Sequence, residues 1–164
     1  MKFKMYLPIL ALTAMLSFSC SSEDFSNETL DATSLPTAPA AKSIEIEILE
    51  LLNAHRISIG LPSLNNHGTI KAVAYTHTDY MVEVDNVSHD NFFQRKNSLI
   101  DNANASKVSE NVAYAYSNAQ SVVNAWLNSD GHRQNIEGDF TDFDISAEQN
   151  ANGQWYFTNI FVKR

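Results

Sequence analysis

The chain carries Ser-His-Asp-Asn-Phe at 88–92, Ser-Glu-Asn-Val-Ala at 109–113 and Trp-Leu-Asn-Ser-Asp-Gly-His-Arg-Gln-Asn-Ile at 126–136, and these three motifs organise the rest. Each motif places a proton-exchanging or metal-binding side chain at the end of a predicted element, where a turn can direct it into a cleft. The three side chains are His89, Glu110 and His132. Two imidazoles and a carboxylate can hold a divalent metal, activate a water molecule or orient a ligand through hydrogen bonds, and all three roles stay open at this point.

Several segments around these motifs predict helices. Apolar residues recur at helical spacing over 43–59 and 69–84, and Gly-Leu-Pro at 60–62 ends the first of these segments. His77 falls on the apolar stripe of the second segment, which is typical of a core histidine. A third helix is predicted over 118–129 with Trp126 facing inward, followed by a single turn at 132–136.

The remaining segments predict a small sheet. Residues 94–109 are polar, which indicates a long covering loop or a short helix, and a short strand is predicted over 112–116. Two more strands, over 143–149 and 154–162, flank the hairpin signal Asn-Ala-Asn-Gly at 150–153. Three antiparallel strands with three or four helices give an α+β layered domain.

Glu110 and His132 each have two interpretations. A carboxylate at the mouth of a buried strand is either an acceptor for loop amides or a site residue with a perturbed pKa, and Glu110 could be both. His132 is expected just past the C-terminus of the preceding helix, so it is either a site residue or a partner of that helix dipole.

The N-terminal region predicts export and anchoring. Two lysines and an apolar run indicate a signal peptide over 1–19, and Cys20, the single cysteine of the chain, follows small residues in the manner of a bacterial lipobox. Leu16 lies one place upstream of the usual lipobox leucine. We expect Cys20 to be acylated and 20–42, rich in Ser, Thr, Ala, Pro and acids, to be a disordered tether. One domain is predicted over 43–164.

The charge of the chain argues against nucleic acid as a partner. Signal cleavage removes two lysines and no acids, which leaves 9 basic and 19 acidic residues and a formal net charge of −10. Such a surface repels phosphate, and the sequence contains no basic patch. The acidic Ser-Ser-Glu-Asp at 21–24 resembles export signals of surface lipoproteins in the Bacteroidetes. The expected location is therefore the outer membrane or cell surface of a Gram-negative bacterium.

The motifs, together with Asn-Ala-His-Arg at 53–56 and Trp-Tyr-Phe-Thr-Asn-Ile-Phe at 155–161, resemble the bacterial branch of the CAP superfamily, which groups cysteine-rich secretory proteins, antigen 5 and pathogenesis-related proteins. The resemblance covers nearly all of 45–162. It implies an α-β-α sandwich and a surface cleft lined by two histidines and two acids that can bind a divalent metal such as zinc.

Carried over to this chain, the resemblance assigns specific residues to the cleft. His89 matches the Ser-His motif, Glu110 the Glu-Asn motif, and His132 the bacterial Gly-His-Arg motif. Ser129 stands where the family has its second glutamate. The residues expected to support the cleft are Asn111, Trp126 and Ser129.

Three functions are compatible with these residues. The favoured one is a lipid-anchored, non-enzymatic module whose cleft binds a small apolar or sterol-like ligand, a peptide or a protein partner. The second is a peptidase or cell-wall hydrolase in which Glu110 or His89 activates a water, with or without a metal. Neither a Gly-x-Ser-x-Gly nor a His-Glu-x-x-His motif occurs. The third is a purely structural polar network.

Overall fold

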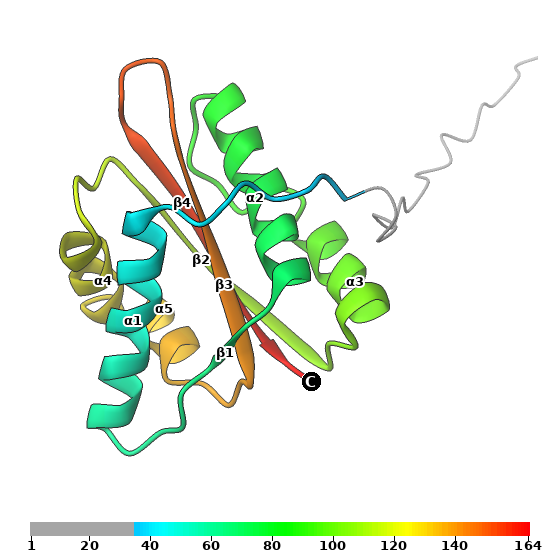
Figure 1. Ribbon diagram of the computed structural model, residues 1–164, viewed down its shortest axis with the longest axis vertical. Helices are drawn as coiled ribbons and strands as arrows, with labels where there is room; N and C mark the ends of the chain where they lie inside the picture. The colour runs from blue at the N-terminus through cyan, green and yellow to red at the C-terminus, as the bar shows by residue number, and fades with distance from the viewer. Residues whose placement is uncertain (1–34) are drawn as a thin grey trace, which may run out of the picture.

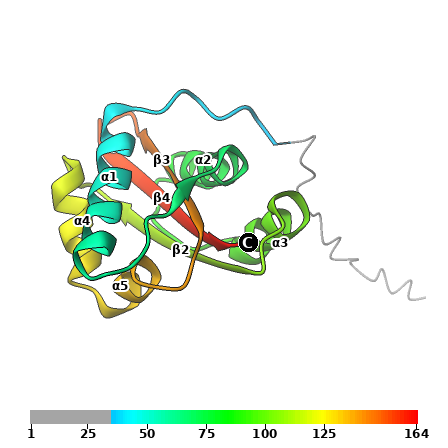
Figure 2. The ribbon, with the colours of Figure 1, turned by 60° about the horizontal axis from the view of Figure 1, so that its bottom comes forward.

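The computed structural model describes residues 35–164, so the predicted signal peptide over 1–19, Cys20 and residues 21–34 lie outside the described residues. A four-stranded sheet lies between two layers of helices (Figures 1 and 2), which confirms the predicted α+β sandwich. The elements in chain order are α1 (Ser43–Ser58), β1 (Asn65–Asn66), α2 (Gly68–Glu83), α3 (Phe92–Ala103), β2 (Lys107–Tyr114), α4 (Ala119–Leu127), α5 (Asp130–Ile136), β3 (Asp142–Gln149) and β4 (Trp155–Lys163). No helix within 35–164 has the length and apolar character needed to cross a membrane.

The strand order is β1-β3-β4-β2, which leaves β2 at one edge of the sheet. The predicted hairpin forms: β3 and β4 pair antiparallel, and β2 pairs antiparallel with β4. The sheet has one strand more than predicted, because Asn65 and Asn66 pair in parallel with Asp142 and Phe143. Two adjacent asparagines have no alternating apolar pattern, so β1 left no signal in the sequence.

Each face of the sheet has its own core. Trp126, Phe143, Phe157 and Phe161 lie in the cluster under α1, α4 and α5. The second cluster, under α2 and α3, contains Ile70, Val73, Ala74, Leu99, Ala103, Ala105, Ile160 and Val162. Neighbours such as Ile160 and Phe161 enter opposite clusters because successive side chains of a strand alternate between faces. Leu35 packs against the second cluster, so the packed part of the chain begins before α1.

The segment after the Ser-His motif differs most from the prediction. Of the two structures predicted for 94–109, a long covering loop or a short helix, the helix is the one that forms: α3 spans twelve residues between Asn91 and Asn104, both in the left-handed conformation. The buried face of α3 includes Arg95 and Ser98, so its polar residues hid the helical pattern. Strand β2 then begins at Lys107, five residues before the predicted start at 112, and Glu110 therefore lies inside the strand.

The predicted position of His132 is also corrected. Helix α4 ends at Leu127, and α5 begins at Asp130 with Ser129 as its N-cap residue. His132 therefore lies in the first turn of α5 and not at the C-terminal end of a helix. The interpretation of His132 as a partner of a C-terminal helix dipole is wrong, because the N-terminal end of a helix carries the opposite partial charge.

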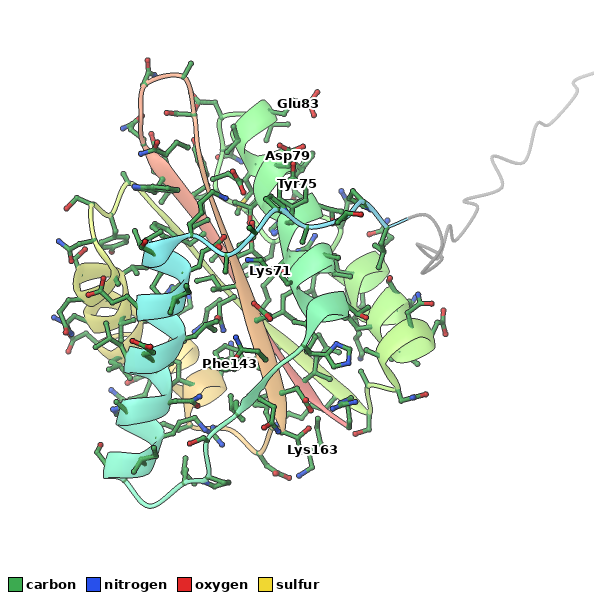
Figure 3. All side chains as sticks on the ribbon, viewed as in Figure 1. Lys71, Tyr75, Asp79, Glu83, Phe143 and Lys163 are labelled. Carbon is green, nitrogen blue, oxygen red and sulfur yellow. The ribbon has the colours of Figure 1, made fainter. Side chains whose placement is uncertain are left out.

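Side chains cap exposed backbone along both β2 and β3. On β2, Trp126 Nε1 donates to Val112 O at 3.0 Å and Asn135 Nδ2 donates to Glu110 O at 3.2 Å. On β3, past the two residues that pair with β1, the backbone N–H of Ala147 donates to Glu45 Oε1 at 2.8 Å. Lys71 Nζ, which reaches from α2 toward β3 (Figure 3), donates to Ile145 O at 3.1 Å. These contacts occupy groups that would otherwise be free to pair with another strand.

Candidate functional site

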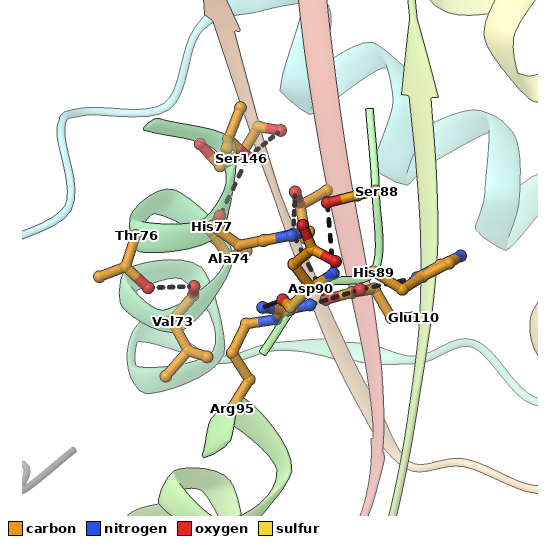
Figure 4. Close-up of polar contacts among 12 residues, drawn as sticks. Val73, Ala74, Thr76, His77, Ser88, His89, Asp90, Arg95, Glu110 and Ser146 are labelled. Carbon is orange, nitrogen blue, oxygen red and sulfur yellow. Dashed lines mark hydrogen bonds and ion pairs between the residues drawn. The ribbon is translucent and has the colours of Figure 1, made fainter. Parts of the chain in front are cut away.

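Glu110 is the centre of the site. Its side chain leaves β2 on the α2 and α3 side and is buried, with the residue only 5% exposed. Arg95 binds it through two hydrogen bonds, Nε to Oε2 at 2.8 Å and Nη2 to Oε1 at 2.7 Å (Figure 4). Arg95 itself is buried, and Nη1 donates to Asp90 O. The paired guanidinium and carboxylate thus join α3, the Ser-His loop and β2.

His89 adds a third hydrogen bond to the same carboxylate. Its Nδ1 lies 2.9 Å from Glu110 Oε1 (Figure 4), while 54% of its side chain remains exposed. An ionised carboxylate only accepts hydrogen bonds, so Nδ1 carries the proton and Nε2 is the free nitrogen of the neutral ring. Glu110 therefore fixes the tautomer and orientation of His89.

His77 lies against the buried side of the cluster. Its Nδ1 is 3.2 Å from Thr158 Oγ1 and 3.7 Å from Glu110 Oε2. Burial lowers the pKa of His77 to about 4, against the opposing attraction of Glu110. The prediction of a core histidine is confirmed by its burial, and its proximity to Glu110 is an additional finding.

Glu110 is ionised at neutral pH despite its burial. Burial by itself raises the pKa of this carboxyl, but the hydrogen bonds from His89 and Arg95, and the charge of Arg95, together lower the pKa below its usual value. The pKa of Glu110 is thus perturbed, as one of the two interpretations expected, whereas the donors to its carboxylate are the side chains of Arg95 and His89 in place of the loop amides expected by the other.

The predicted supporting residues join β2 to α4 and α5. Asn111 Nδ2 donates to His132 O at 3.1 Å, and Asn135 Nδ2 donates to Asn111 Oδ1 at 2.8 Å. Trp126 is held by its bond to Val112 O. Asn111 therefore positions the backbone of His132, whereas Trp126, Ser129 and His132 line a hollow of about 420 Å³.

His89 and His132 line different hollows along β2. The hollow next to His89 has a volume of about 500 Å³ and is also lined by Phe92, Phe93, Val108, Ser109, Glu110 and Asn135. Burial, followed by the charge of His89, lowers the pKa of His132. The structure thus brings His89 and Glu110 into direct contact, and His132 lies in the adjoining hollow. We call the two hollows together the β2 cleft.

The residues of the β2 cleft do not fit a resident zinc ion. The carboxylate of Glu110 is already paired with a cation: Arg95 donates to both of its oxygens, and Oε1 accepts a further hydrogen bond from His89. Within 35–164, no three His, Cys, Asp or Glu side chains are placed to hold a metal ion. The cation that compensates Glu110 is the guanidinium of Arg95.

Arg95 was not identified from the sequence as a residue of the site. It lies three residues after Phe92 and four before Leu99, a spacing that puts all three on one side of a helix. This spacing was the available signal, and the polar residues between 94 and 109 obscured it.

The sequence and the geometry both match a known family. Residues 49–161 match the cysteine-rich secretory protein family, abbreviated CAP. The chain belongs to the CAP family. A curated relative, the uncharacterized membrane protein YlbC of Bacillus subtilis, is 32% identical over 126 residues, which make up 73% of this chain and 34% of that protein. The CAP chain described here thus spans about a third of that relative's length.

Solved structures share the CAP fold. An outer surface protein of Borrelia burgdorferi has a TM-score of 0.65 at 22% identity, over 71% of this chain and 90% of its own. An extracellular protein with an SCP domain from Bacillus anthracis has a TM-score of 0.64 at 25% identity, over 73% and 40%. A cysteine-rich secretory protein from Staphylococcus aureus has a TM-score of 0.63 at 18% identity, over 77% and 40%.

Proposed function

We propose that this CAP domain is an exported, lipid-anchored envelope protein whose β2 cleft binds a ligand with an apolar body and a hydrogen-bonding group. The observation that carries the proposal is the state of Glu110. Its carboxylate is neutralised by Arg95, so it orients His89 and leaves the Nε2 of His89 as the polar contact at the cleft.

The wall of the cleft favours an apolar ligand. Phe92, Phe93 and Val108 line the hollow beside His89, and Phe93 is 75% exposed. An aromatic side chain left in water at the mouth of a hollow gains free energy when a ligand covers it. The imidazole of His89 then selects ligands with a hydroxyl or amide group.

Binding fits Glu110 better than base catalysis does. A general base needs a lone pair within reach of the substrate, and a lowered pKa makes a carboxylate a weaker base. The side chain of Glu110 is 1% exposed and its two oxygens are occupied by Arg95. The peptidase or cell-wall hydrolase remains the alternative function, and the observation that favours it is the His89–Glu110 bond, through which His89 Nε2 could accept a proton from water.

The proposed location rests on the N-terminal sequence and on the relatives. The lipobox-like Cys20 predicts acylation, and the solved relatives are described as an extracellular protein and an outer surface protein. Both support a chain that works outside the cytoplasm, attached to the outer membrane or cell surface through Cys20.

A fluorescent apolar probe tests the binding function. The mature protein with Cys20→Ala should bind 1-anilinonaphthalene-8-sulfonate in the β2 cleft, and Phe93→Ala should weaken this binding severalfold. Ile100→Ala is the matched control, because Ile100 is an exposed apolar residue of α3 that does not line the cleft. Equal probe binding by the Phe93→Ala and wild-type proteins would contradict the proposal.

A second experiment separates binding from hydrolysis. His89→Gln keeps a polar side chain at the cleft and removes the base. The binding proposal expects neither protein to cleave casein or purified peptidoglycan. Cleavage by the wild-type protein that is lost in His89→Gln would establish the hydrolase instead.

Membrane attachment has its own test. The full-length chain expressed in a Gram-negative host should incorporate labelled palmitate and fractionate with membranes. Cys20→Ala should lose the label and become soluble without detergent. Persistent membrane fractionation of the Cys20→Ala chain would rule out acylation as the anchor.

A further inference from the structure

A third hollow, of about 500 Å³, lies beside β3 and between α1 and α2, and it shares no lining residue with the β2 cleft. We call it the α1–α2 pocket. Lys71, labelled in Figure 3, marks its α2 side, and Ala41 closes it from the segment that precedes α1. The remaining lining residues are Glu45, Ile46, Leu49, Glu50, Asn53, Ala54, Ile57, Asn66 and Asp144. The site proposed above uses none of them.

The charges of this pocket are not balanced. Three carboxylates line it, those of Glu45, Glu50 and Asp144, against one ammonium group. That ammonium, on Lys71, is committed to Glu45 Oε2 at 2.9 Å and to Ile145 O at 3.1 Å. The pocket therefore has an excess of negative charge after its internal ion pair is formed.

Asp144 is the carboxylate that this pairing leaves without a cation. Four carboxylate residues are buried within 35–164: Glu45, Glu110, Asp142 and Asp144. The first three form ion pairs with Lys71, Arg95 and Arg164 respectively. Asp144 has no ion pair among the described residues, and its oxygens accept only from the backbone N–H groups of Ile145 and His67, at 2.9 and 3.2 Å.

The burial of Asp144 without a cation is unfavourable for its ionised form, and a cationic ligand would remove this penalty. A buried carboxylate is stable when a cation and hydrogen bonds replace its water. Burial raises the pKa of Asp144, and Glu45 raises it further, whereas the bonds from Ile145 and His67 and the charge of Lys71 lower it less. The residue is 5% exposed and lines the pocket, so the missing cation can be supplied from that side.

We propose that the α1–α2 pocket binds an alkylammonium ligand, with a primary ammonium group on Asp144 and its carbon chain along α1. The apolar wall is formed by Leu49, Ala54 and Ile57, and Ile57 is 61% exposed. A metal cation fits less well, because the three carboxylates of the pocket are not placed to hold a metal ion together, nor is any other group of three His, Cys, Asp or Glu side chains within 35–164. A single carboxylate beside an apolar wall matches an ammonium group that carries a hydrocarbon.

Three six-carbon probes test this assignment on the mature protein with Cys20→Ala: hexylammonium, 1-hexanol and hexanoate. Amide resonances of Asp144, Ile145 and His67 report binding by nuclear magnetic resonance at pH 7. Hexylammonium should bind at least about tenfold more tightly than 1-hexanol, the difference expected for a charge-assisted hydrogen bond. Hexanoate should not bind.

Two variants and one control locate the ligand. Asp144→Asn should reduce the preference for hexylammonium over 1-hexanol to about twofold or less, because the charge-assisted hydrogen bond is lost. Ala54→Trp, at an exposed position of α1, should fill the pocket and abolish the binding of both probes. Asp79→Asn removes the same charge from an exposed position of α2 outside the pocket and should bind as the wild type does.

The proposal is overturned by any of three results. These are equal affinity of the wild type for hexylammonium and 1-hexanol, undiminished hexylammonium binding by both Asp144→Asn and Ala54→Trp, and no saturable binding of hexylammonium to the wild type. The β2 cleft probe, measured on the same variants, should be unaffected, so a failure here leaves the proposed function of that cleft intact.

Discussion

Glu110 and Asp144 are both buried carboxylates on strands of one sheet, yet they differ in what surrounds them. Glu110 has a guanidinium and an imidazole within hydrogen-bond distance, and its pKa lies below the usual value. Asp144 has only backbone N–H groups, and its pKa lies above the usual value. The difference shows that burial alone does not define a site. A fully compensated carboxylate holds structure, and an uncompensated one is open to a ligand.

The largest effect is expected at the cation of the compensated pair. Arg95→Met should destabilise the protein by about 3–5 kcal/mol, because it leaves the Glu110 charge buried without its partner. Urea unfolding at pH 7 measures this change. Lys96→Met is the control on the same helix, and the double variant Arg95→Met, Glu110→Gln should recover part of the loss. A change in Arg95→Met no larger than in the control would contradict the account.

The pH dependence of the free energy of unfolding tests whether the charge of Glu110 stabilises the fold. Its folded-state pKa is lowered, so its contribution is fully present above the unfolded pKa of about 4.3 and is lost as pH falls through the folded pKa. The free energy of unfolding of the wild type should therefore exceed that of Glu110→Gln at pH 7, and the two should converge in acid. A constant difference down to pH 3 would show that charge is not the cause.

The contribution of Asp144 to the free energy of unfolding should change with pH in the opposite direction. Its folded-state pKa is raised, so the wild type loses stability as pH rises from the unfolded pKa of about 3.9 through the folded pKa. Asp144→Asn should thus be more stable than the wild type at pH 7 and should lose this advantage at pH 3, with one weakened backbone hydrogen bond offsetting part of the gain. Lys71, Glu45 and the N–H of His67 stay in place in this variant. Destabilisation that persists across this pH range would remove the contrast with Glu110.

The smallest change in stability is expected at His89. More than half of its side chain is exposed, so solvent screens its bond to Glu110, and His89→Ala should cost only about 0.2–1 kcal/mol. Thermal unfolding at pH 7 measures this. A loss as large as that of Arg95→Met would mean that His89, and not Arg95, is the main partner of Glu110.

The sequence predicted the layers of the fold and singled out His89 and Glu110, which the structure brings into contact. The sequence predicts α1, α2 and the hairpin between β3 and β4 because the buried faces of these elements are apolar. Helix α3 was predicted only as an alternative to a loop, because it buries the polar residues Arg95 and Ser98, and Arg95 was not predicted as the partner of Glu110. Strand β1 was not predicted either, since two adjacent asparagines have no alternating apolar pattern and their pairing with β3 is seen only in the structure. Asp144 looked like any polar residue of a strand, because a missing partner has no signature in the sequence.

The path of residues 35–42 has a mechanical consequence. This segment crosses from α2 to the start of α1 (Figure 1), with Leu35 packed in one core and Lys42 bonded to Glu148 at 2.6 Å. In a chain held at Cys20, a pull on the tether would load Leu35 first and the Lys42–Glu148 pair next. Ala41, which lies between these two attachments, closes the α1–α2 pocket. Tension on the anchor would therefore act on the wall of that pocket and, through the Lys42–Glu148 pair, directly on β3, the strand that carries Asp144.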